Sequence, residues 1–463
     1  MAVWSEVTLS TLQYTRFDGE FYSPQYIKDD RLWAYFSDKY SIKKLGKLLS
    51  SPVRTGHTPR DRRITKDDEL VHFIKTNTLR EGRVDYSNCF FLPKRVLKAT
   101  DFIPNDSVVV TIIGATPEIV GRTAIIRDID PARVTNQNVA IIETSNLLDP
   151  YYLTAYFQTK YGRDQLWRHS RRTEQVNLNC REVERVIIPY IDIEKQKKIG
   201  NLIRDSFSRL DLSQSLYTQA QQLLERELGL DKLFFDKPLS YEARLSEVVG
   251  NNRADADYYQ TRYKQLRSHV SSNRSGIQRL IDFATVLRPN IDPSKSPSSE
   301  FKYVELADIN PTLGIINSAN TLLGKELPSR ARREVAKGDV IASSVVGSVD
   351  KAALVDEAND GCLASTGFFH FRPKNNIKSE FLLLLVRSRC VTMQLQQEST
   401  GGILSAVPDQ RLRNVIIPNI DPSIQNKIAD LVYQSHKNIN QSKQLLEQAK
   451  RRVEELIEQA VQK

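Results

Sequence analysis

The stretch VIIPYID at residues 186–192 returns as VIIPNID at residues 415–421, 229 positions later. The match continues into the residues that follow, at the same offset. Gln196, Lys198, Ile199 and Leu202 correspond to Gln425, Lys427, Ile428 and Leu431. A single offset that holds over so many positions indicates an internal repeat.

Further matches upstream extend the repeat over nearly the whole chain. Residues 106–114 (DSVVVTIIG) match residues 339–347 (DVIASSVVG) at an offset of 233. Arg16, Asp18, Tyr22 and Tyr26 match Arg253, Asp255, Tyr259 and Tyr263 at an offset of 237. The slow drift of the offset indicates small insertions, so we expect two tandem copies of one unit in the same order.

Each copy is predicted to be rich in strands first and helical last. Short β-branched runs at 108–113, 123–126 and 139–142 are separated by Gly, Pro and Asn, and runs at 340–346, 352–355 and 368–371 repeat the pattern. After each VIIP stretch the apolar residues recur with the 3.6-residue period of a helix. Each of these regions predicts one helix of about 35 to 40 residues, about 55 Å long at 1.5 Å per residue.

Helices of this length exceed what a compact domain of this size needs, although an amphipathic helix that covers one domain is the simpler interpretation. Because the two apolar stripes are alike, we expect the helices to form an antiparallel pair that holds the two globular parts apart. The residues expected to pack are Ile199, Ile203, Phe207, Leu210 and Leu224 on the first helix and Ile428, Leu431, Ile439, Leu446 and Val453 on the second. Asp192 and Asp421 are predicted to cap the two helix N-termini.

The predicted fold class is therefore α+β, with two small β-containing domains joined by two long antiparallel helices in a pseudo-twofold tandem repeat. The expected boundaries are residues 1–190 for the first domain, 191–233 for the central helix, 234–419 for the second domain and 420–463 for the C-terminal helix. A chain of 463 residues is long enough to give both domains a hydrophobic core.

The charge balance makes a polyanion the first partner to consider. Lys and Arg number 66 against 56 Asp and Glu, which gives a formal net charge of +10. Clustered cations bind nucleic acid because they release counterions from its phosphates. The basic residues gather in residues 54–66, 163–172 and 325–337. Each of these segments is equally compatible with a solvated loop.

Motifs of the common catalytic and metal sites are missing from the sequence. Cys89, Cys180, Cys362 and Cys390 never form CxxC spacing and no HExxH occurs, so we expect no zinc site. No Walker A loop, GxxxxGKS or GxxxxGKT, is found, so we do not expect this chain to be an ATP-driven motor. The nearest approach to an amino-methyltransferase motif is DPYY at residues 149–152, which lacks a second proline and follows no Gly-rich loop. We interpret it as the N-terminal turn of a helix.

Hydropathy predicts no membrane span. The longest purely aliphatic and aromatic run, residues 381–386, is far shorter than the ~20 residues that cross a bilayer. The first ten residues do not show a basic region followed by an apolar stretch, so we expect no signal peptide and a reducing, cytoplasmic setting without disulfides.

Together these features resemble the DNA-specificity (S) subunits of type I restriction-modification systems, in the order target-recognition domain, helix, target-recognition domain, helix. The most specific element is hydrophobic-x-Ile-Pro followed by a Gln-x-Lys-Ile helix start, present at residues 186–199 and 415–428. GHTP at residues 56–59 resembles the family's Gly-x-Thr-Pro loop, and residues 106–114 and 338–347 resemble its Gly-Asp-hydrophobic strand. The second copy departs from the pattern with RPN at residues 288–290, where the Gly-x-Thr-Pro loop is expected.

The resemblance implies a non-catalytic subunit of a prokaryotic methyltransferase and restriction complex. Each target-recognition domain would read one half of a bipartite site in double-stranded DNA. The helices would set the spacer and dock two methyltransferase (M) subunits, and restriction and motor (R) subunits would join through the complex. No cofactor is expected on this chain. S-adenosylmethionine, ATP and Mg²⁺ are expected on the partner subunits.

The resemblance also gives the basic segments candidate roles in DNA binding, by phosphate contact or by pairing with base edges. In the first copy the candidates are Arg54, His57, Arg60, Arg62, Arg63, Lys66, Arg168, His169, Arg171, Arg172, Gln175 and Asn177. In the second copy they are Lys325, Arg330, Arg332 and Arg333, because residues 394–405 are uncharged apart from one glutamate. For every single residue, plain surface exposure remains the alternative.

Three other functions are compatible with part of the sequence. A free-standing DNA-binding regulator would share the basic loops but would not need such long helices. A related phage-defence methyltransferase system would use a similar subunit. A recognition domain fused to a methyltransferase would need the cofactor and Pro-Pro motifs that the sequence lacks. The DNA sequence read and the spacer length do not follow from the chain.

Overall fold

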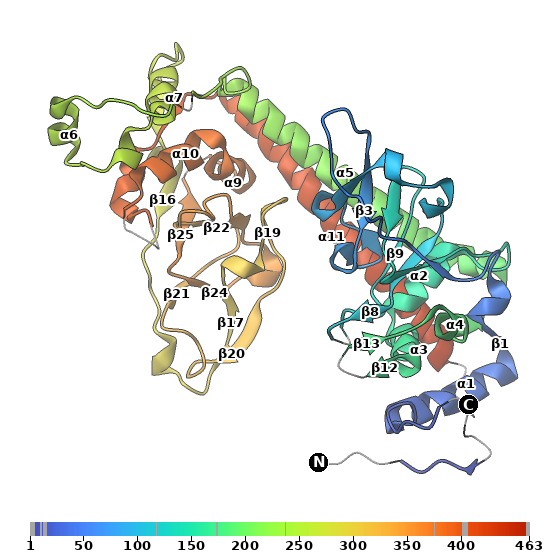
Figure 1. The fold of residues 1–463 in the computed structure, drawn as a ribbon. Helices are drawn as coiled ribbons and strands as arrows, with labels where there is room; N and C mark the ends of the chain where they lie inside the picture. The colour runs from blue at the N-terminus through green and yellow to red at the C-terminus, as the bar shows by residue number, and fades with distance from the viewer. Residues whose placement is uncertain are drawn as a thin grey trace. The chain divides into compact units, whose positions relative to one another are not determined.

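The computed structural model (Figure 1) describes residues 5–9, 12, 16–116, 118–172, 175–236, 238–374, 376–400 and 406–459. The chain forms two compact units. Unit 1 consists of Met1–Ser208 and Gln441–Lys463, and unit 2 consists of Arg209–Asn440. Helices α5 (Ile193–Glu227) and α11 (Pro422–Glu458) contribute residues to both units.

Unit 1 is built on several small sheets. The larger sheets have the strand orders β2 (Arg54–Thr55), β11 (Val139–Ile142), β7 (Val108–Thr111), β9 (Thr123–Ile125), and β10 (Arg133–Thr135), β3 (Leu70–Ile74), β6 (Phe90–Pro93). The remaining strands are β1 (Ser41–Lys44) with β14 (Ile187–Tyr190), β4 (Leu79–Arg80) with β5 (Arg83–Val84), and β12 (Arg171–Arg172) with β13 (Val176–Asn177) and β8 (Ile113–Gly114). The helices are α1 (Pro24–Lys39), α2 (Pro150–Gln158), α3 (Lys160–His169) and α4 (Cys180–Glu184).

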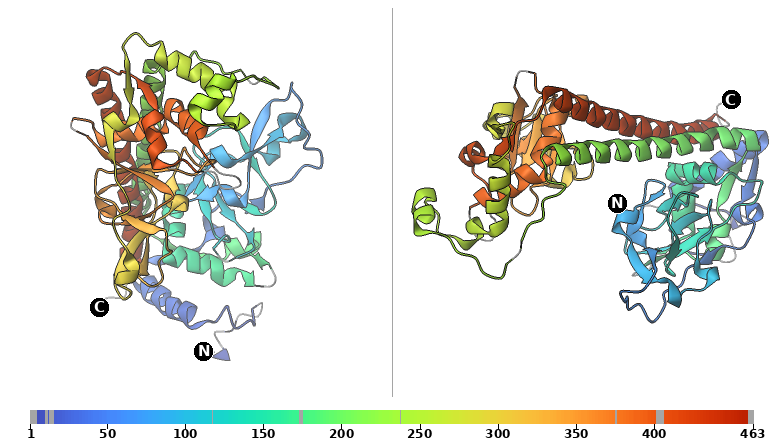
Figure 2. Two further views of the ribbon diagram at one scale, coloured as in Figure 1. Left: turned by 90° about the vertical axis from the view of Figure 1, so that its left-hand side faces the viewer. Right: turned by 90° about the horizontal axis from the view of Figure 1, so that it is seen from above.

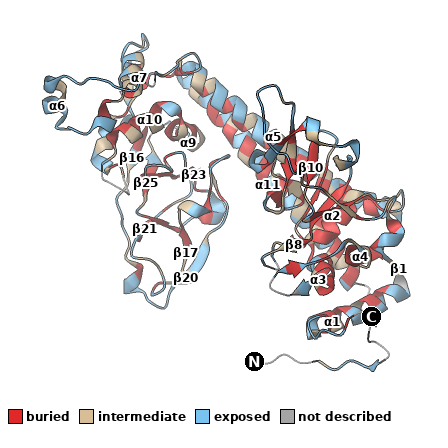
Figure 3. Cartoon of the chain, in the orientation of Figure 1, coloured by how far each residue is buried: buried red, intermediate tan, exposed pale blue. Residues whose placement is uncertain are grey.

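Helix α2 occupies the centre of unit 1 and connects it to the VIIP stretch. Seven of its nine residues are buried, which Figure 3 shows in red. Two of its tyrosine hydroxyls donate to β14 carbonyls, from Tyr152 to Pro189 and from Tyr156 to Ile187, both at 2.7 Å. Asp149 accepts a hydrogen bond from the Tyr152 N–H at 2.8 Å, so the DPYY stretch is the N-terminal turn of a helix, as predicted.

Unit 2 contains two larger sheets. Their strand orders are β16 (Ala284–Val286), β25 (Phe368–Pro373), β22 (Val340–Ser343), β23 (Ala352–Leu354), β19 (Ile315–Ile316), β18 (Ile309–Asn310), and β20 (Asn320–Leu323), β17 (Glu300–Val304), β24 (Leu363–Ser365), β21 (Ala331–Glu334). Strand β15 (Ile277–Arg279) pairs with β26 (Ile416–Pro418). The helices are α6 (Leu245–Asn251), α7 (Thr261–Ser271), α8 (Leu280–Phe283), α9 (Ser379–Arg387) and α10 (Arg389–Glu398).

Equivalent strand pairs occur in the two units. Strand β3 pairs in parallel with β10, and β17 pairs in parallel with β24, while β7 and β22 each lie between two antiparallel neighbours. The registers correct one sequence alignment. Val108 pairs with Ile142 in unit 1, and Val340 pairs with Phe371 in unit 2. Ile142 and Phe371 correspond at the offset of 229, so their partners Val108 and Val340 also correspond. The offset of this strand is therefore 232 rather than 233. Asp106 therefore corresponds to Gly338, not to Asp339. Both residues lie just before the strand, and both have a positive φ, 59° for Asp106 and 88° for Gly338.

The two long helices have the predicted length, 35 residues for α5 and 37 for α11. Figure 2 shows them from two further sides, α5 in green and α11 in red. The predicted caps are confirmed, because Asp192 accepts from the Glu194 N–H at 2.9 Å and Asp421 from the Ser423 N–H at 2.8 Å. Among the residues described, no helix is long and apolar enough to cross a bilayer.

Contacts between α5 and α11 are described within each unit. In unit 1 the Ser206 hydroxyl donates to the Ser442 carbonyl at 2.8 Å. In unit 2 Arg209 donates to Asn438 at 3.1 Å and the Ser213 and Ser435 hydroxyls lie 3.0 Å apart, so the helices run antiparallel there. The residues expected to pack all lie in apolar cores: Ile199, Ile203, Phe207, Leu446 and Val453 in unit 1, and Leu210, Leu224, Ile428, Leu431 and Ile439 in unit 2.

A buried carboxylate connects β22 to β25 in unit 2. Asp339 is 1% exposed and lies 2.6 Å from His370 Nε2, and it accepts hydrogen bonds from Arg372 and from the Ala336 N–H at 2.8 and 2.9 Å. Burial raises the pKa of Asp339, but the hydrogen bonds from His370 and Arg372 outweigh burial and lower it to about 2. The ionised carboxylate therefore stabilises the fold.

We predict that Asp339→Asn lowers the free energy of unfolding by about 3–5 kcal/mol at pH 7, because it leaves buried donors without their charged partner. A carboxylate with a lowered pKa stabilises the fold above its unfolded pKa, so the deficit of the variant should shrink as the pH falls from about 4 towards about 2. Urea unfolding monitored by circular dichroism measures both effects.

The matched control is Asp106→Asn, at the exposed turn of unit 1, where asparagine tolerates the positive φ. This variant should stay within about 0.5 kcal/mol of the parent protein. An equal loss in both variants would contradict the role given to the Asp339 carboxylate.

Candidate nucleic-acid interface

A loop in unit 1, residues 56–68, is fixed at its base by the GHTP stretch. A Cβ on Gly56 would lie 2.0 Å from the Thr135 carbonyl oxygen, so only glycine allows the chain to pass β10 this closely. The Thr58 hydroxyl donates to the Gln137 side-chain oxygen at 2.9 Å. The loop therefore leaves strand β2 in a defined direction.

The outer part of this loop is held by Arg95, which follows strand β6. Arg95 donates to the Asp68 carboxylate and to the Arg63 carbonyl, both at 2.8 Å, and lies 3.5 Å from Asp61. Asp68 also accepts from the Thr65 N–H at 2.7 Å, and these hydrogen bonds lower the pKa of Asp68. The loop thus exposes a cluster of cations, Arg60, Arg62, Arg63 and Lys66, beside the exposed His57. We call residues 60–66 the braced loop.

Arg54 has a structural role instead. Its guanidinium donates to the carbonyls of Thr100 and Phe102, at 3.1 and 3.2 Å, and lies 3.4 Å from Glu143. Because most of its donors are used inside unit 1, we remove Arg54 from the candidates for DNA contact.

Arg168 and His169 are a second correction, because each is only 7% exposed. The Arg168 guanidinium donates to the Phe21 carbonyl at 3.1 Å and to both carboxylate oxygens of Asp30 on α1. His169 packs edge-on against Phe21, with ring centroids 5.6 Å apart. Burial, together with the neighbouring Arg168 and Arg16, lowers the pKa of His169 to about 3, so the ring is neutral at pH 7.

Arg16 has a structural role that the sequence did not reveal. The sequence analysis aligned it with Arg253 but gave it no role. It is 4% exposed, forms a 2.7 Å ion pair with Asp18, and donates to the carbonyls of His169 and Ser170 at the end of α3. The Tyr22 hydroxyl donates to the Arg16 carbonyl at 3.1 Å.

The same arrangement occurs at the end of α10 in unit 2. Arg253 forms a 2.6 Å ion pair with Asp255 and donates to the Ser399 carbonyl at 2.8 Å, and the Tyr259 hydroxyl donates to the Arg253 carbonyl at 2.7 Å. The repeated Arg-x-Asp pattern was the signal in the sequence. Its structural meaning is that an upstream segment covers the end of α3 or α10.

The residues after α3 remain at the surface. The Arg171 side chain is 62% exposed, although it lies 3.2 Å from Glu182, and Gln175 and Asn177 are exposed. The β12–β13 hairpin is attached to β8, with Asn177 opposite Ile113. The Arg172 side chain and residues 173–174, like residues 401–405 of unit 2, lie outside the described part of the chain.

The four candidates of unit 2 also divide into exposed residues and residues held by contacts inside the unit. Lys325 and Arg330 are exposed, and Arg332 is held by Asp292 at 2.8 Å. Arg333 is a third correction. It is 4% exposed and donates to the Leu287 carbonyl at 2.7 Å, and burial lowers its pKa.

Sequence analysis missed an exposed aromatic pair on the edge strand β6. Phe90 and Phe91 are 56% and 42% exposed, and the Lys75 ammonium lies 3.7 Å above the centre of the Phe90 ring. In the register of unit 2, the equivalent strand β20 carries Asn320 and Thr321. The signal was the pair of adjacent phenylalanines, because neighbouring side chains of a strand point to opposite faces and a sheet with one covered face buries only one of them.

No group of three or more His, Cys, Asp and Glu side chains that would hold a metal ion occurs among the described residues. No family model matches the chain. The sequence is similar to two curated proteins. It is 19% identical over 160 residues to the type I restriction enzyme StySPI specificity subunit of Salmonella potsdam, covering 34% of each chain. It is 29% identical over 111 residues to the type I restriction enzyme HindI specificity subunit of Haemophilus influenzae, covering 23% of this chain and 24% of that one.

The chain resembles type I specificity subunits, as the sequence motifs indicated. The matches span 34% and 24% of the length of these relatives.

Solved structures of S subunits are similar over most of the chain. The type I restriction-modification S subunit from M. genitalium aligns over 91% of this chain and 96% of its own, with 12% identity and a TM-score of 0.45. The HsdS subunit from Thermoanaerobacter tengcongensis aligns over 90% and 95%, with 13% identity and a TM-score of 0.29. Both TM-scores are below 0.5, and we draw no conclusion from these two structures.

We predict that Arg168→Ala destabilises the protein by roughly 2–3 kcal/mol, because it removes charge-assisted hydrogen bonds to Asp30 and to the Phe21 carbonyl. Thermal unfolding measures the loss. Arg60→Ala, which removes an exposed arginine from the braced loop, should leave the melting temperature unchanged. A stable Arg168→Ala variant with weakened DNA binding would reverse our correction.

Proposed function

We propose that this chain is the DNA-specificity subunit of a type I restriction-modification complex, with each unit reading one half of a bipartite DNA site. The braced loop is the observation that carries the proposal. It presents four cations without a buried partner, on a backbone that Arg95 holds in place. Cations in this arrangement bind DNA phosphates, and the similarity to type I specificity subunits supplies the biological setting.

The two units are proposed to be two copies of one target-recognition domain. The equivalent parallel pairs β3–β10 and β17–β24 support a tandem repeat. The serine contacts of the long helices support it too, because Ser206 and Ser442 lie 229 positions from Ser435 and Ser213, which form the other pair. In this proposal α5 and α11 set the spacer and dock two M subunits, and residues 1–190 and 234–419 form the recognition domains.

The two half-sites are proposed to differ in sequence. Phe90 and Phe91 present apolar surface on β6, the strand that precedes Arg95, which suits contact with bases or sugars. Asn320 and Thr321 at the equivalent place in unit 2 present amide and hydroxyl groups, which suit hydrogen bonds to base edges. Exposed Lys325 and Arg330 would contact phosphates in unit 2.

In this proposal the chain performs no catalysis of its own. S-adenosylmethionine would be bound by the M subunits, and ATP and Mg²⁺ by the R subunits, in the cytoplasm of a prokaryotic cell. A related phage-defence methyltransferase system would use the chain in the same way. Co-purification with an adenine methyltransferase tests both forms of the proposal against a free-standing DNA-binding regulator.

We predict that the triple variant Arg60→Gln, Arg62→Gln, Arg63→Gln binds duplex DNA with a weaker salt dependence. Each lost phosphate contact reduces the slope of log K against log salt by about 0.9, so the slope should fall by up to about 2.7. Fluorescence anisotropy at several salt concentrations measures it. A matched control, Lys28→Gln, Arg31→Gln, Lys47→Gln, removes three exposed cations from other elements of unit 1. Equal slopes for the two triple variants would contradict a specific role of the braced loop.

The spacer is predicted to follow helix length. Arg209 and Asn438 face each other at 3.1 Å, so four residues inserted after each lengthen both helices at one level by about 6 Å. DNA advances about 3.4 Å per base pair, so the gap between half-sites should grow by about two base pairs. Four residues nearly complete a helical turn, which keeps the apolar stripes approximately in phase.

Methylome sequencing of a host that expresses the variant with its methyltransferase measures the gap. The half-site sequences should stay the same, because the recognition loops are untouched. Methylation at sites with the original gap would show that the length of these helices does not set the distance between the half-sites.

A further inference from the structure

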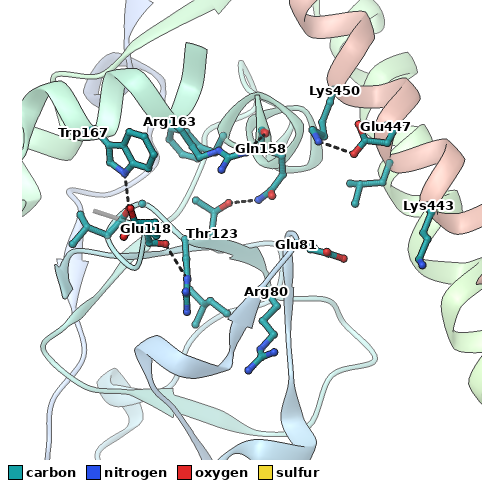
Figure 4. A pocket seen from close by; sticks show the side chains of 16 residues that line it. Arg80, Glu81, Glu118, Thr123, Gln158, Arg163, Trp167, Lys443, Glu447 and Lys450 are labelled. Atoms are coloured by element: carbon teal, nitrogen blue, oxygen red, sulfur yellow. Dashed lines mark hydrogen bonds and ion pairs between the residues drawn. The ribbon is translucent and has the colours of Figure 1, made fainter. Parts of the chain in front are cut away.

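A cavity of about 600 Å³ lies in unit 1 between the β4–β5 hairpin, helices α2 and α3, and α11. Figure 4 shows the side chains that line it, which come from all these elements. Its lining includes five cationic side chains, Arg80, Arg122, Arg163, Lys443 and Lys450. Of these, Arg163 lies in the basic segment 163–172, and the other four lie outside the three basic segments.

Of the five lining cations, Lys450 alone forms an ion pair with a carboxylate among the described residues. Lys450 is paired with Glu447 at 2.6 Å, and Arg122 donates to the Glu118 carbonyl at 3.0 Å. Among the described residues, no carboxylate forms an ion pair with Arg80, Arg163 or Lys443. Against the five cations stand the carboxylates of Glu81, Glu118 and Glu447, so the lining keeps a formal net charge of +2.

The rest of the lining is mixed. It includes three carboxylates, from Glu81, Glu118 and Glu447, beside apolar side chains from Leu79, Val120, Phe157 and Leu446. Trp167 also lines the cavity, and its indole N–H donates to the Val120 carbonyl at 2.8 Å. The volume falls in the range of about 300–1,000 Å³ that small-molecule sites occupy.

Unit 2 fills the equivalent place with its own side chains. At the offset of 229, Arg387 of unit 2 corresponds to Gln158 of unit 1, and Tyr217 corresponds to Leu446. The Arg387 guanidinium donates to the Tyr217 hydroxyl and to the carbonyl of Pro311, which follows β18 as Glu81 follows β4.

The unpaired cations are also specific to unit 1. Where it has Arg80, Arg163 and Lys443, unit 2 has the uncharged residues Asn310, Thr392 and Gln214. At these three positions unit 1 therefore carries positive charge where unit 2 carries none.

We propose that this cavity binds a phosphate group, supplied either by a free nucleotide or by the DNA backbone. Arg80 and Arg163 would form charge-assisted hydrogen bonds with phosphate oxygens, and Lys443 would add a point charge from α11. Binding would connect the globular part of unit 1 to the end of α11. The free-nucleotide source does not depend on the proposed function, whereas the DNA source does.

The first experiment titrates the full-length protein with inorganic pyrophosphate by isothermal calorimetry. Arg80→Gln, Arg163→Gln, Lys443→Gln should weaken binding at least about tenfold, because each charge-assisted hydrogen bond contributes about that factor. Leu446→Trp keeps every cation but fills the cavity, and should weaken binding as much. The control Lys28→Gln, Arg31→Gln, Lys47→Gln removes equal charge elsewhere and should bind like the parent protein.

The second experiment measures the salt dependence of binding to duplex DNA for the same variants. A smaller slope in the cavity variants than in the control identifies the DNA backbone as the source. An unchanged slope with lost pyrophosphate binding identifies a free nucleotide. The proposal is overturned if the parent protein does not bind pyrophosphate and the slopes are unchanged, or if the control loses as much as the cavity variants. If the parent protein binds no DNA, the proposed function fails and the pyrophosphate titration alone decides.

Discussion

Hydrogen bonds hold the strand that precedes each long helix in one register. This register fixes the residue at which the helix begins. In unit 1 the hydroxyls of Tyr152 and Tyr156 donate to β14 carbonyls, and the Gln196 amide donates to the carbonyl of Ile191, at the turn into α5. Buried hydroxyls without an acceptor are costly, so β14 cannot slip by a residue. Gln165 accepts from the Ile187 N–H in unit 1, and Gln394 accepts from the equivalent N–H in unit 2. The VIIP stretch is therefore the joint between each globular part and its helix.

The parts of the molecule that could be predicted from the sequence are those governed by periodicity and local motifs. The lengths of α5 and α11, their caps at Asp192 and Asp421, and the helical nature of DPYY all follow from nearest neighbours along the chain. The candidate site was harder, because a charged residue in a sequence does not show which distant segment covers it. Arg168 and Arg333 are cationic in the sequence and buried in the structure. The one-residue error at residues 106 and 339 has a similar origin, since only strand pairing fixes register.

Two differences between the units lie on the exposed face of one strand and in the lining of the cavity in unit 1. The strand pairs and the Arg-x-Asp contacts that fix the backbone occur in both units. By contrast, the exposed face of β6 carries Phe90 and Phe91 where β20 carries Asn320 and Thr321. Backbone pairing and buried polar contacts tolerate little change, because each loss leaves a group unsatisfied, whereas exposed side chains are free to change. A duplicated fold can therefore keep one framework and present two different surfaces.

In the proposed function, the braced loop illustrates why charge alone does not determine how DNA is read. Four cations on a mobile loop would attract DNA at long range as strongly as four cations on a fixed one, because the attraction depends on net charge near the surface. They would lose more conformational entropy on binding, and they would not present a constant geometry to the groove. Arg95 prevents this by holding Asp68 and the Arg63 carbonyl, while the basic side chains stay in solvent. If the proposed function holds, the fixed backbone, rather than the number of charges, is what suits this segment to reading a sequence.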